Sequence, residues 1–419
     1  MTPLRTIILA AGKGIRMNSD TPKVLHCVCG KPMIQYVIEV IKSVGSLKNY
    51  VVLGYQFEQV RPVLDQSCII ILQKKMLGTA DAIASAASPF KSYRGDILVL
   101  CGDSPLLTTE TILNLVKKHK TSKASATILT STVKDPQRYG RIIRNDQGEV
   151  MAVREQKDAT PLEKQIEEIN TGVYCFQSEA LFKTVKSIRM NEKKKEFYLT
   201  DIIGLLVQKG FKVESVETPD FWVGLGINTR EDLALAESVM RQRILKNFMI
   251  HGVTIEDPAT TYIAYNVKIG HDTVIRPATV IENDVSIGSR CQIGPFCRLR
   301  PGTRIADDVE IGNFTEVSRS QVGKSSLMKH FSFLGDAVVG SKVNIGAGVV
   351  TANFDGKTKN RTIISDQAFI GSDSILVAPV KVGKRAMTGA GSVVTKGKVI
   401  PDGKIAVGVP ARILRRKQA

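Results

Sequence analysis

An aliphatic residue recurs at every sixth position through much of the second half of the chain. The longest run in strict register consists of Ile263, Ile269, Ile275, Ile281, Ile287, Ile293, Leu299, Ile305, Ile311 and Val317. Neither the period of an α-helix, about 3.6 residues, nor that of a strand, about two, produces this spacing. A parallel β-helix does, because three six-residue sides form one triangular coil with the aliphatic residue pointing inward. We therefore predict a left-handed parallel β-helix over residues 251–419.

The six-residue register is interrupted twice. The first interruption covers Gly323–His330, and the register resumes at Val339. The second covers Asn353–Arg361, after which the register continues from Ile364. Insertions in solenoid proteins form loops on one face, which is often the binding face. We therefore expect two loops near a ligand site, the first of them ending at His330.

The first 228 residues show a different pattern, in which short apolar runs alternate with segments of helical spacing such as Pro32–Val44. The apolar runs are Thr6–Leu9, Val51–Leu53, Ile69–Leu72 and Ile97–Leu100. Continuous runs of this kind favour a parallel sheet that is buried on both faces. We predict an α/β domain, doubly wound and Rossmann-like, over residues 1–228. We also predict a linker helix over residues 229–250, with Thr229 as its N-cap.

Composition limits the classes of function. Hydrophobic residues make up 43% of the chain and charged residues 23%, which is typical of a folded protein. No apolar stretch approaches the roughly 20 residues that cross a bilayer, and the N-terminus lacks the pattern of a signal peptide, so we expect no membrane association. The seven cysteines are scattered, with no metal-binding pair, which is typical of reduced thiols in a cytoplasmic protein.

The net charge of +18 is spread over both halves of the chain. Residues 1–228 hold 31 Lys and Arg against 23 Asp and Glu, and residues 229–419 hold 27 against 17. Nucleic-acid binders usually cluster their basic residues and interleave aromatic ones, whereas aromatic residues amount to only 6% here. We therefore expect no nucleic-acid partner. The charge instead fits small anionic substrates such as nucleotides and sugar phosphates.

A glycine-rich string follows the first predicted strand. It begins with Leu9, Ala10, Ala11 and Gly12, continues to Met17, and is followed by Pro22 and Lys23. Glycines allow backbone N–H groups to approach an anion. The side chains of Lys13, Arg16 and Lys23 add cationic donors that suit a triphosphate. The whole string resembles the signature loop of sugar-1-phosphate nucleotidylyltransferases.

Two oxygen-bearing residues are candidates for a metal site. Asp103 comes just after the run Ile97–Leu100, at the edge where α/β sheets bind ligands. A carboxylate is a natural Mg²⁺ ligand in nucleotide sites, and the amide oxygen of Asn228 could supply a second ligand. Taken alone, Asp103 could equally begin a turn, and Asn228 could cap a helix.

Further polar residues lie between these motifs. The candidates for reading the edge of a base are Gln73, Gly78 and Thr79, and those for positioning a sugar are Gly140, Glu155 and Asn170. Each of these strings taken alone is ordinary loop chemistry.

Both halves together resemble one family, the bacterial bifunctional N-acetylglucosamine-1-phosphate uridyltransferase / glucosamine-1-phosphate N-acetyltransferase. In the first half the resemblance rests on Leu9–Met17, Pro22–His26, Leu77–Thr79, Gly102–Asp103, Tyr139–Ile142, Lys157–Ala159, Glu168–Gly172 and Thr200–Ile202. In the second half it rests on Ile293–Phe296, Arg298–Gly302, Gly312–Phe314, His330, Asn344–Gly348 and Asn353–Gly356. These motifs cover nearly the whole chain.

The resemblance implies that the first domain condenses UTP with N-acetylglucosamine 1-phosphate and releases pyrophosphate. It implies that Lys23 and Arg16 stabilise the phosphates in the transition state, and that Asp103 and Asn228 hold Mg²⁺. The residues implied to bind UTP or the UDP-sugar are Leu9, Ala10, Ala11, Gly12, Lys23, Gln73, Gly78, Thr79, Gly140, Glu155, Asn170 and Asn228. Such chemistry works by positioning and electrostatics and needs no covalent nucleophile.

For the second domain, the resemblance implies transfer of an acetyl group from acetyl-CoA to glucosamine 1-phosphate. His330 matches the general base that takes the proton of the attacking amine. The residues that match binding positions for the sugar phosphate or acetyl-CoA are Arg300, Asn344, Asn353, Lys359, Ser372 and Ala390. We also expect a homotrimer, because the flat faces of a β-helix can bury against copies of themselves and a threefold ring closes.

The chain departs from the family pattern mainly in its second half. Ser318 stands where the family usually has a lysine for the sugar phosphate. Arg319 could compensate only if its side chain points the same way, and the alternation of side chains along a strand argues against this. The other departures are Phe333 and Phe354 for tyrosines, Gly408 for an arginine and, in the first half, Cys101 for an aromatic residue. We therefore expect weakened sugar-phosphate binding with the chemical step retained.

Three functions remain open from the sequence. The chain could be a bifunctional enzyme, a uridyltransferase whose β-helix is only a trimerisation scaffold, or a nucleotidylyltransferase for another sugar or for dTTP. His330 and the two interruptions favour the first over the second, because a scaffold needs neither. Glu155 and Asn170–Gly172 favour an N-acetylated sugar over the third.

Overall fold

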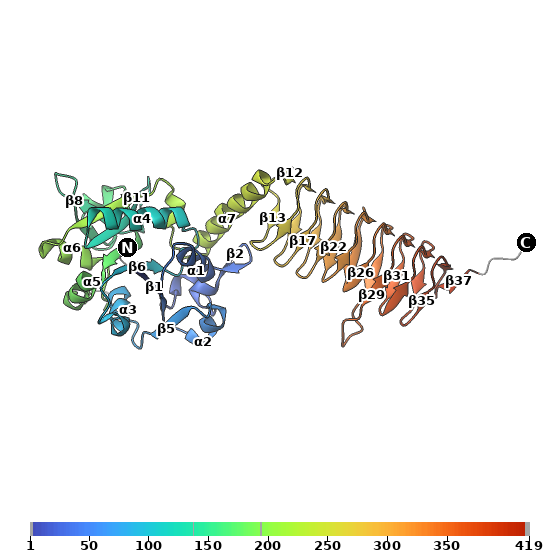
Figure 1. The fold of residues 1–419 in the computed structure, drawn as a ribbon, viewed down its shortest axis with the longest axis horizontal. Coiled ribbons are helices and arrows are strands. Elements are labelled where there is room, and N and C mark those ends of the chain that lie inside the picture. Colours follow the sequence, from blue (N-terminus) through green and yellow to red (C-terminus); the bar gives the residue numbers. More distant parts are fainter. Residues whose placement is uncertain (1–2, 137, 193–194, 415–419) are drawn as a thin grey trace, which may run out of the picture. The chain divides into compact units, whose positions relative to one another are not determined.

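The computed structural model describes residues 3–136, 138–192 and 195–414, and it divides into two compact units, Met1–Met240 and Arg241–Ala419 (Figure 1). The division falls inside helix α7 (Arg230–Ile250), the helix predicted over residues 229–250. The hydroxyl of Thr229 accepts a hydrogen bond of 3.1 Å from the backbone N–H of Asp232, so Thr229 caps the helix as expected. In the described ranges, no helix combines the length and the apolar character needed to cross a membrane.

A mixed sheet forms the centre of the first unit, with the strand order β11-β7-β10-β6-β1-β4-β5 along its main path. The four predicted runs form β1 (Leu4–Ala10), β4 (Asn49–Leu53), β5 (Cys68–Leu72) and β6 (Asp96–Cys101). The remaining strands are β7 (Ala126–Thr132), β8 (Arg141–Arg144), β9 (Val150–Arg154), β10 (Glu168–Gln177) and β11 (Val213–Glu217), with a separate hairpin of β2 (Cys27–Val28) and β3 (Lys31–Pro32). The predicted Rossmann-like α/β fold is confirmed.

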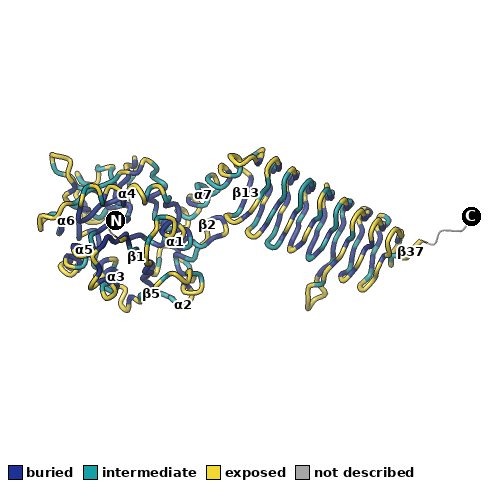
Figure 2. The backbone as a smooth tube through the Cα atoms, in the orientation of Figure 1, coloured by how far each residue is buried: buried dark blue, intermediate teal, exposed yellow. Residues whose placement is uncertain are grey.

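Helices cover both faces of this sheet. They are α1 (Met33–Ser43), α2 (Phe57–Val60), α3 (Thr79–Ser85), α4 (Thr109–Ser122), α5 (Ser178–Thr184) and α6 (Asp201–Gln208). Neighbouring residues of β1 point to opposite faces, so Ile7 packs in one buried cluster with α3, α5 and α6, and Ile8 packs in another with α1 and α4. Figure 2 shows the central strands as buried.

Two features of the sheet differ from the prediction. The sheet is not wholly parallel, because β10 runs antiparallel to both β6 and β7. The run Ile69–Leu72 is not buried on both faces, because β5 is the edge strand of the sheet. The side chains of Ile69 and Leu72 are 42% and 47% exposed. A continuous apolar run thus indicated a strand correctly but did not show whether the strand is central or lies at the edge.

The second unit is a parallel β-helix of three stacked sheets, as predicted (Figure 1). The first side contains β12 (Thr254–Ile255), β15 (Val274–Ile275), β18 (Gln292–Ile293), β21 (Glu310–Ile311), β24 (Leu327–Met328), β27 (Asn344–Ile345), β30 (Phe369–Ile370), β33 (Met387–Thr388), β36 (Ile405–Val407) and β37 (Arg412–Ile413). The second side contains β13 (Tyr262–Ile263), β16 (Val280–Ile281), β19 (Arg298–Leu299), β22 (Thr315–Ser318), β25 (Ser332–Gly335), β28 (Val350–Ala352), β31 (Ile375–Val377) and β34 (Val393–Val394). The third side contains β14 (Lys268–Ile269), β17 (Ser286–Ile287), β20 (Arg304–Ile305), β23 (Gln321–Val322), β26 (Ala337–Val339), β29 (Thr362–Ile364), β32 (Val380–Val382) and β35 (Val399–Ile400).

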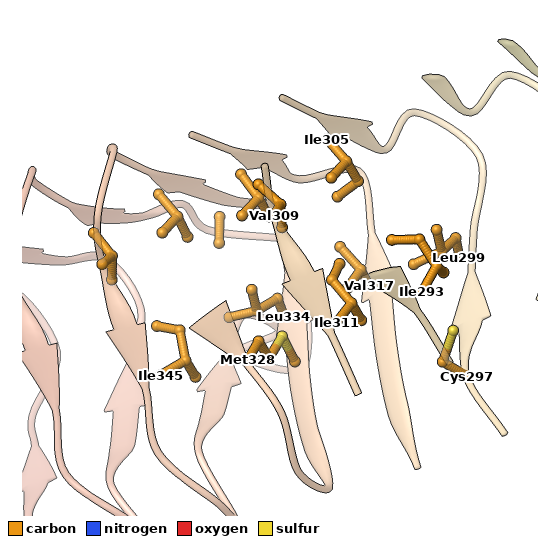
Figure 3. Close-up of a cluster of buried hydrophobic side chains, with 14 of the residues drawn as sticks. Ile293, Cys297, Leu299, Ile305, Val309, Ile311, Val317, Met328, Leu334 and Ile345 are labelled. Carbon is orange, nitrogen blue, oxygen red and sulfur yellow. The ribbon is translucent and has the colours of Figure 1, made fainter. Parts of the chain in front are cut away.

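The residues of the six-residue period form the interior of this β-helix. Ile293, Leu299, Ile305, Ile311 and Val317 are buried and stack between the three sheets (Figure 3). Each side chain packs against its equivalents in the coils before and after, so the period of the sequence becomes a continuous apolar column.

The first predicted interruption is not a loop, because β24 lies within Gly323–His330 and β23 and β25 flank this segment in regular order. The register instead loses one residue at each of two corners. Val317 and Val322 are successive inward residues only five positions apart, and so are Leu334 and Val339. Strands in these coils therefore pair with partners 17 residues away instead of 18, as in the pair of Val317 and Leu334. The sequence suggested a break because a shortened corner shifts the period without adding chain.

The second predicted interruption is a true loop. It leaves the β-helix between β28 and β29 and protrudes beside β29 (Figure 1). Phe354 and Lys359 form an isolated antiparallel bridge across it. Asn360 donates its backbone N–H to the backbone oxygen of Asn353 at 2.6 Å, which closes the base of the loop.

Candidate active sites

The glycine-rich string leaves the sheet at its centre, where β1 lies between β4 and β6. The backbone N–H of Gly102 donates to the backbone oxygen of Leu9 at 2.9 Å and joins the ends of β1 and β6. Gly14 has a left-handed φ of 65°, and a Cβ there would lie 2.6 Å from the Cβ of Lys23. Only glycine permits this approach, so the string folds directly against Lys23.

Four residues predicted for the phosphates and the metal converge at this edge. The ammonium of Lys23 forms an ion pair with the carboxylate of Asp103 and donates a hydrogen bond of 2.9 Å to Asn228 Oδ1. Arg16 Nη2 donates to the same oxygen, also at 2.9 Å. The site therefore combines two cations with two oxygen donors from four separate segments of the chain.

The orientation of Asn228 is set by its neighbours. Its side-chain nitrogen donates to the backbone oxygen of Gly226 at 2.9 Å, so Oδ1 is directed toward the two cations. Its backbone N–H donates to Asp232 Oδ2, also at 2.9 Å, and Asp232 accepts from Thr229 N–H as well. Asp232 was not predicted as a site residue. The signal was present, because a Thr three residues before an acidic residue is a capping pattern.

The oxygen donors fit a magnesium ion. Asp103 and Asn228 both contact the single ammonium group of Lys23, so their oxygens face a common point. Mg²⁺ is usually held by one or two carboxylates together with water and substrate phosphates rather than by a full cage of protein ligands. Across the residues that the structure describes, no group of three or more His, Cys, Asp and Glu side chains could hold a metal. The donor set of Asp103 and Asn228 is therefore one that a nucleotide would complete.

The residues predicted to read the base form one cluster. Gln73 is buried, and its Nε2 donates to the backbone oxygen of Gly78 at 3.1 Å and to Asp81 Oδ2 at 2.6 Å. These two bonds fix the direction of the amide group. The hydroxyl of Thr79 accepts from the backbone N–H of Leu199 at 2.9 Å, so it already has a structural contact.

The residues predicted for the sugar also lie together. The backbone N–H of Asn170 donates to the backbone oxygen of Gly140 at 2.8 Å. Glu155 directly follows β9, which pairs with β8 next to Gly140. The carboxylate of Glu155 accepts from the Thr200 hydroxyl at 2.9 Å. Burial raises the pKa of Glu155, and the nearby charge of Asp201 raises it further.

The side chain of Asn170 is used within the protein. Its Nδ2 donates to the hydroxyl of Tyr174 at 2.7 Å, and its Oδ1 accepts from the backbone N–H of Gly172 at 3.2 Å. These bonds hold the irregular stretch of β10 between Asn170 and Tyr174, where the pairing with β7 shifts register. Asn170 is therefore placed beside Gly140 with its side chain already committed to local structure.

A buried arginine, Arg141, lies within the predicted motif Tyr139–Ile142, although it was not among the residues predicted to bind the sugar. Arg141 is only 1% exposed, and its Nη1 donates to the backbone oxygen of Tyr139. Burial lowers the pKa of its guanidinium. The bond holds the backbone just before Gly140.

In the second unit, His330, Ser372 and Ala390 stack at one corner. Each follows by two residues an inward residue of the first side, namely Met328, Ile370 and Thr388. Ile345 of the intervening coil pairs with both Met328 and Ile370, so His330 lies two coils from Ser372, and Ser372 lies one coil from Ala390. His330 is exposed at the end of this side that leads into β25. Asn344 lies on β27 of the same side, between Leu327 and Phe369 of the adjacent coils.

The predicted anion-binding residues of the second unit gather at a different corner. Arg300 directly follows β19 and donates from Nη1 to Glu316 Oε1 at 2.8 Å. Asn353 Nδ2 donates to Asp336 Oδ2. The pKa of Asp336 is lowered mainly by a hydrogen bond from Arg319, and the charge of Lys359 lowers it further. The four-residue strand β25 lies between this corner and that of His330, a span of about 13 Å at roughly 3.3 Å per residue.

Comparison with known proteins gives matches over nearly the whole chain. Residues 5–236 match the nucleotidyl transferase family model, and residues 261–354 match the GMPPB C-terminal domain model. The chain is 43% identical to the bifunctional protein GlmU of Geobacillus thermodenitrificans, with 96% of this chain and 94% of the relative covered. It is 43% identical to the bifunctional protein GlmU of Halalkalibacterium halodurans, with 93% of each covered. It is 41% identical to that of Streptococcus thermophilus, with 96% of this chain and 94% of the relative covered.

Proposed function

The chain belongs to the family of bifunctional GlmU proteins, and from this premise we propose that it makes UDP-N-acetylglucosamine by two reactions. The second unit transfers an acetyl group from acetyl-CoA to the amine of glucosamine 1-phosphate. The first unit then joins the product to the uridyl group of UTP and releases pyrophosphate. Both reactions take place in the cytoplasm, where UTP and acetyl-CoA are available.

The main support for uridyl transfer is that four side chains meet at one edge of the sheet: Lys23, Arg16, Asp103 and Asn228. A phosphate oxygen of the sugar attacks the α-phosphorus of UTP, and the bond to pyrophosphate breaks. Lys23 and Arg16 stabilise the charge that develops on the phosphate oxygens. Asp103 and Asn228 hold Mg²⁺, which when bound neutralises phosphate charge as a Lewis acid. The string from Leu9 to Gly12 and the Gln73 cluster hold the nucleotide.

Glu155 supports recognition of the amino sugar. A partly buried carboxylate with a raised pKa is costly to the fold, and such groups occur preferentially at functional sites. Beside Gly140 and Asn170, it offers a hydrogen-bond acceptor to the hydroxyl or amide groups of N-acetylglucosamine. The backbone held by Arg141 and by the side chain of Asn170 keeps this surface rigid.

His330 is the proposed general base for acetyl transfer. Its imidazole takes the proton as the amine nitrogen forms a bond to the acetyl carbon, and CoA leaves as the thiol. The alignment of His330, Ser372 and Ala390 at one corner supports this role, because one extended ligand can follow this corner across the four coils from His330 to Ala390. The first interruption of the six-residue register does not support this role, because Gly323–His330 is not a loop. Family membership and the loop Asn353–Arg361 remain as support.

The functional assembly is proposed to be a homotrimer. Phe296, Phe314 and Phe331 lie on consecutive coils beside the corner of His330 and are 54%, 62% and 56% exposed. The rings of Phe296 and Phe314 stack with their centroids 5.3 Å apart. An exposed aromatic row is typical of a surface that another chain covers. A threefold ring of identical β-helices would cover this row in every copy.

An assay that follows the two products separately tests the proposal. Purified protein is given glucosamine 1-phosphate, acetyl-CoA, UTP and Mg²⁺, and the CoA thiol and pyrophosphate are measured in the same reaction. The expected result is both products, with pyrophosphate dependent on prior thiol release. One outcome would overturn acetyl transfer: added N-acetylglucosamine 1-phosphate yields pyrophosphate, but no CoA thiol forms even at millimolar glucosamine 1-phosphate. The β-helix would then be a scaffold only. Equal rates with dTTP or with another sugar phosphate would overturn the assignment of UDP-N-acetylglucosamine.

A further inference from the structure

The corner that follows β22 is one residue shorter than most corners of the β-helix. Arg319 comes directly after the last residue of β22 and has a left-handed φ of 48°. Asp336 occupies the equivalent corner of the next coil, directly after β25, with a φ of 51°. These are the two corners at which the six-residue period loses one residue. Because Arg319 is not in extended backbone, the alternation of side chains along a strand does not apply to it.

The side chain of Arg319 turns back over Ser318. Arg319 Nη1 donates a hydrogen bond of 2.8 Å to the hydroxyl of Ser318, which is itself only 1% exposed. Ser318 lies in register with Arg300 of the preceding coil, because the residues before them, Val317 and Leu299, are paired. The guanidinium therefore stands beside the column that contains Arg300. The expectation that Arg319 points away from this column is wrong.

A carboxylate fixes the guanidinium in this position. Arg319 Nε and Nη2 donate to the two oxygens of Asp336 at 2.7 and 2.8 Å. A guanidinium has five N–H donors, and these two bonds with the bond to Ser318 engage three of them. Two N–H groups remain for another acceptor, and the Arg319 side chain is 38% exposed. A guanidinium held rigidly by a carboxylate loses little freedom when it binds a phosphate.

The surroundings of the pair are cationic. The charge of Lys359 acts on Asp336, and Arg300 donates to Glu316. This corner thus holds three cations, Arg300, Arg319 and Lys359. Its two carboxylates are Glu316 and Asp336. The corner keeps a net positive charge, which suits an anion such as a phosphate group.

The pair of Arg319 and Asp336 differs from another arginine–aspartate pair at a corner of the β-helix. Arg290 also has a left-handed φ, of 56°, and donates from Nε and Nη2 to Asp308 at 2.7 and 3.2 Å. It lies at the corner after β17, a strand of the third side, whereas Arg319 lies at the corner after β22, a strand of the second side. The pair of Arg319 and Asp336 differs because the side chain of Asn353 also donates to Asp336, at the base of the loop that carries Lys359.

We propose that Arg319 binds the phosphate group of the amino-sugar phosphate in the acetyl transfer reaction, and that Asp336 is the positioning residue that holds it there. This inference rests on the acetyl transfer proposed above. It assigns to Arg319 the contact that Ser318 cannot make. The amine and the phosphate of this substrate stand on neighbouring carbons, so the side chains of His330 and Arg319 would approach one sugar from the two ends of β25.

The first test compares Arg319→Ala with its matched control, Arg290→Ala. Acetyl transfer is measured with glucosamine 1-phosphate and with glucosamine, which lacks the phosphate. Arg319→Ala should raise KM for glucosamine 1-phosphate by roughly 10–150-fold, as expected for one lost charged contact, with kcat changed by less than about threefold. It should leave kcat/KM for glucosamine unchanged. Arg290→Ala removes a similar ion pair and should change neither substrate.

A relocated charge and a double variant test the geometry. Adding Ser318→Lys to Arg319→Ala should recover most of the lost affinity, because the new ammonium extends from the position that the guanidinium covered. Asp336→Asn should raise KM for glucosamine 1-phosphate without lowering kcat. It should have no further effect once Arg319 is alanine, since Asp336 acts through that guanidinium. Additive losses in the double variant would contradict the positioning role.

Calorimetry separates a failure of this inference from a failure of the proposed function. If the wild-type protein binds glucosamine 1-phosphate but forms no CoA thiol, acetyl transfer is wrong, and the binding comparison still tests Arg319. Binding lost in Arg319→Ala and kept in Arg290→Ala supports the inference. Equal affinities of the two variants for glucosamine 1-phosphate would overturn the inference. So would an Arg319→Ala variant that loses activity on glucosamine 1-phosphate and on glucosamine by the same factor. Light scattering and thermal unfolding check that each variant keeps its fold and assembly.

Discussion

Lys23 and Asn228 are joined by a hydrogen bond of 2.9 Å between Nζ and Oδ1, although 205 residues separate them in the chain. Lys23 follows the first strand of the sheet, and Asn228 precedes α7 near the end of the unit. The bond therefore forms only when the whole α/β unit has folded. The phosphate and metal residues are assembled by the closure of the fold rather than by one local motif.

Replacement of Lys23 by alanine tests the charge assigned to the phosphates. Lys23→Ala should lower kcat for pyrophosphate release by roughly 10²–10³-fold, the scale expected when one transition-state charge partner is lost. The matched control is Lys42→Ala, which removes a surface lysine paired with Asp65 at 2.7 Å and should leave kcat unchanged. Full activity of Lys23→Ala would show that the ammonium does not contact the reacting phosphates.

The metal assignment is tested by a magnesium titration. Asp103→Asn keeps the shape of the side chain but removes its charge, so it should raise the Mg²⁺ concentration needed for half-maximal uridyl transfer and lower the maximal rate. Acetyl transfer by the same protein should be unaffected, since it belongs to the other unit. An unchanged Mg²⁺ dependence would place the metal elsewhere.

Glu155 predicts a pH-dependent effect on stability. Its pKa is raised in the folded protein, mainly by burial, so folding favours the protonated carboxyl. The carboxyl therefore destabilises the fold at neutral pH, and this cost disappears as the pH falls below the usual range of a glutamate. Glu155→Gln should raise the midpoint of thermal unfolding at pH 7–8, with a smaller gain near pH 4.

The same variant should also lose function. This loss distinguishes a residue of the sugar site from a buried charge that only destabilises the fold. Glu155→Gln should raise KM for N-acetylglucosamine 1-phosphate while leaving KM for UTP unchanged. A more stable protein with unaltered kinetics would argue against a role in sugar binding.

His330 is tested by its effect on one reaction only. His330→Ala should lower kcat for acetyl transfer by roughly 10²–10⁴-fold, the usual contribution of a general base. Pyrophosphate release should remain normal. The control is His271→Ala, an exposed histidine of the same unit that contacts Asp272, and it should change neither reaction. Thiol release at the wild-type rate from His330→Ala would require another base.

The trimer is tested by light scattering. The wild-type protein should have three times the chain mass of 45.8 kDa at micromolar concentration. Phe314→Asp places a charge in the exposed aromatic row and should shift the protein toward smaller species. Leu162→Asp, at a side chain 78% exposed in the first unit, is the control and should leave the mass unchanged. A monomeric wild-type protein would remove the basis for this surface.

The sequence determined the architecture of both units because that information is local or periodic. The six-residue period requires a β-helix, since no other regular structure points every sixth residue inward, and the column from Ile293 to Val317 confirms it. The motif strings indicated the family, which the comparisons confirm. They also named Lys23, Arg16, Asp103 and Asn228 as one group, and these residues meet in the structure.

The tertiary structure decided what depends on neighbours far along the chain. The edge position of Ile69–Leu72 and the antiparallel direction of β10 follow from strand order, which periodicity does not encode. The direction of Arg319 follows from its left-handed corner, where stacking on the next coil and the carboxylate of Asp336 hold the side chain over Ser318. Strand alternation predicted the opposite direction because it applies only to extended backbone. The backbone conformation at a corner is set by how consecutive coils stack, and this becomes defined only when the β-helix has formed.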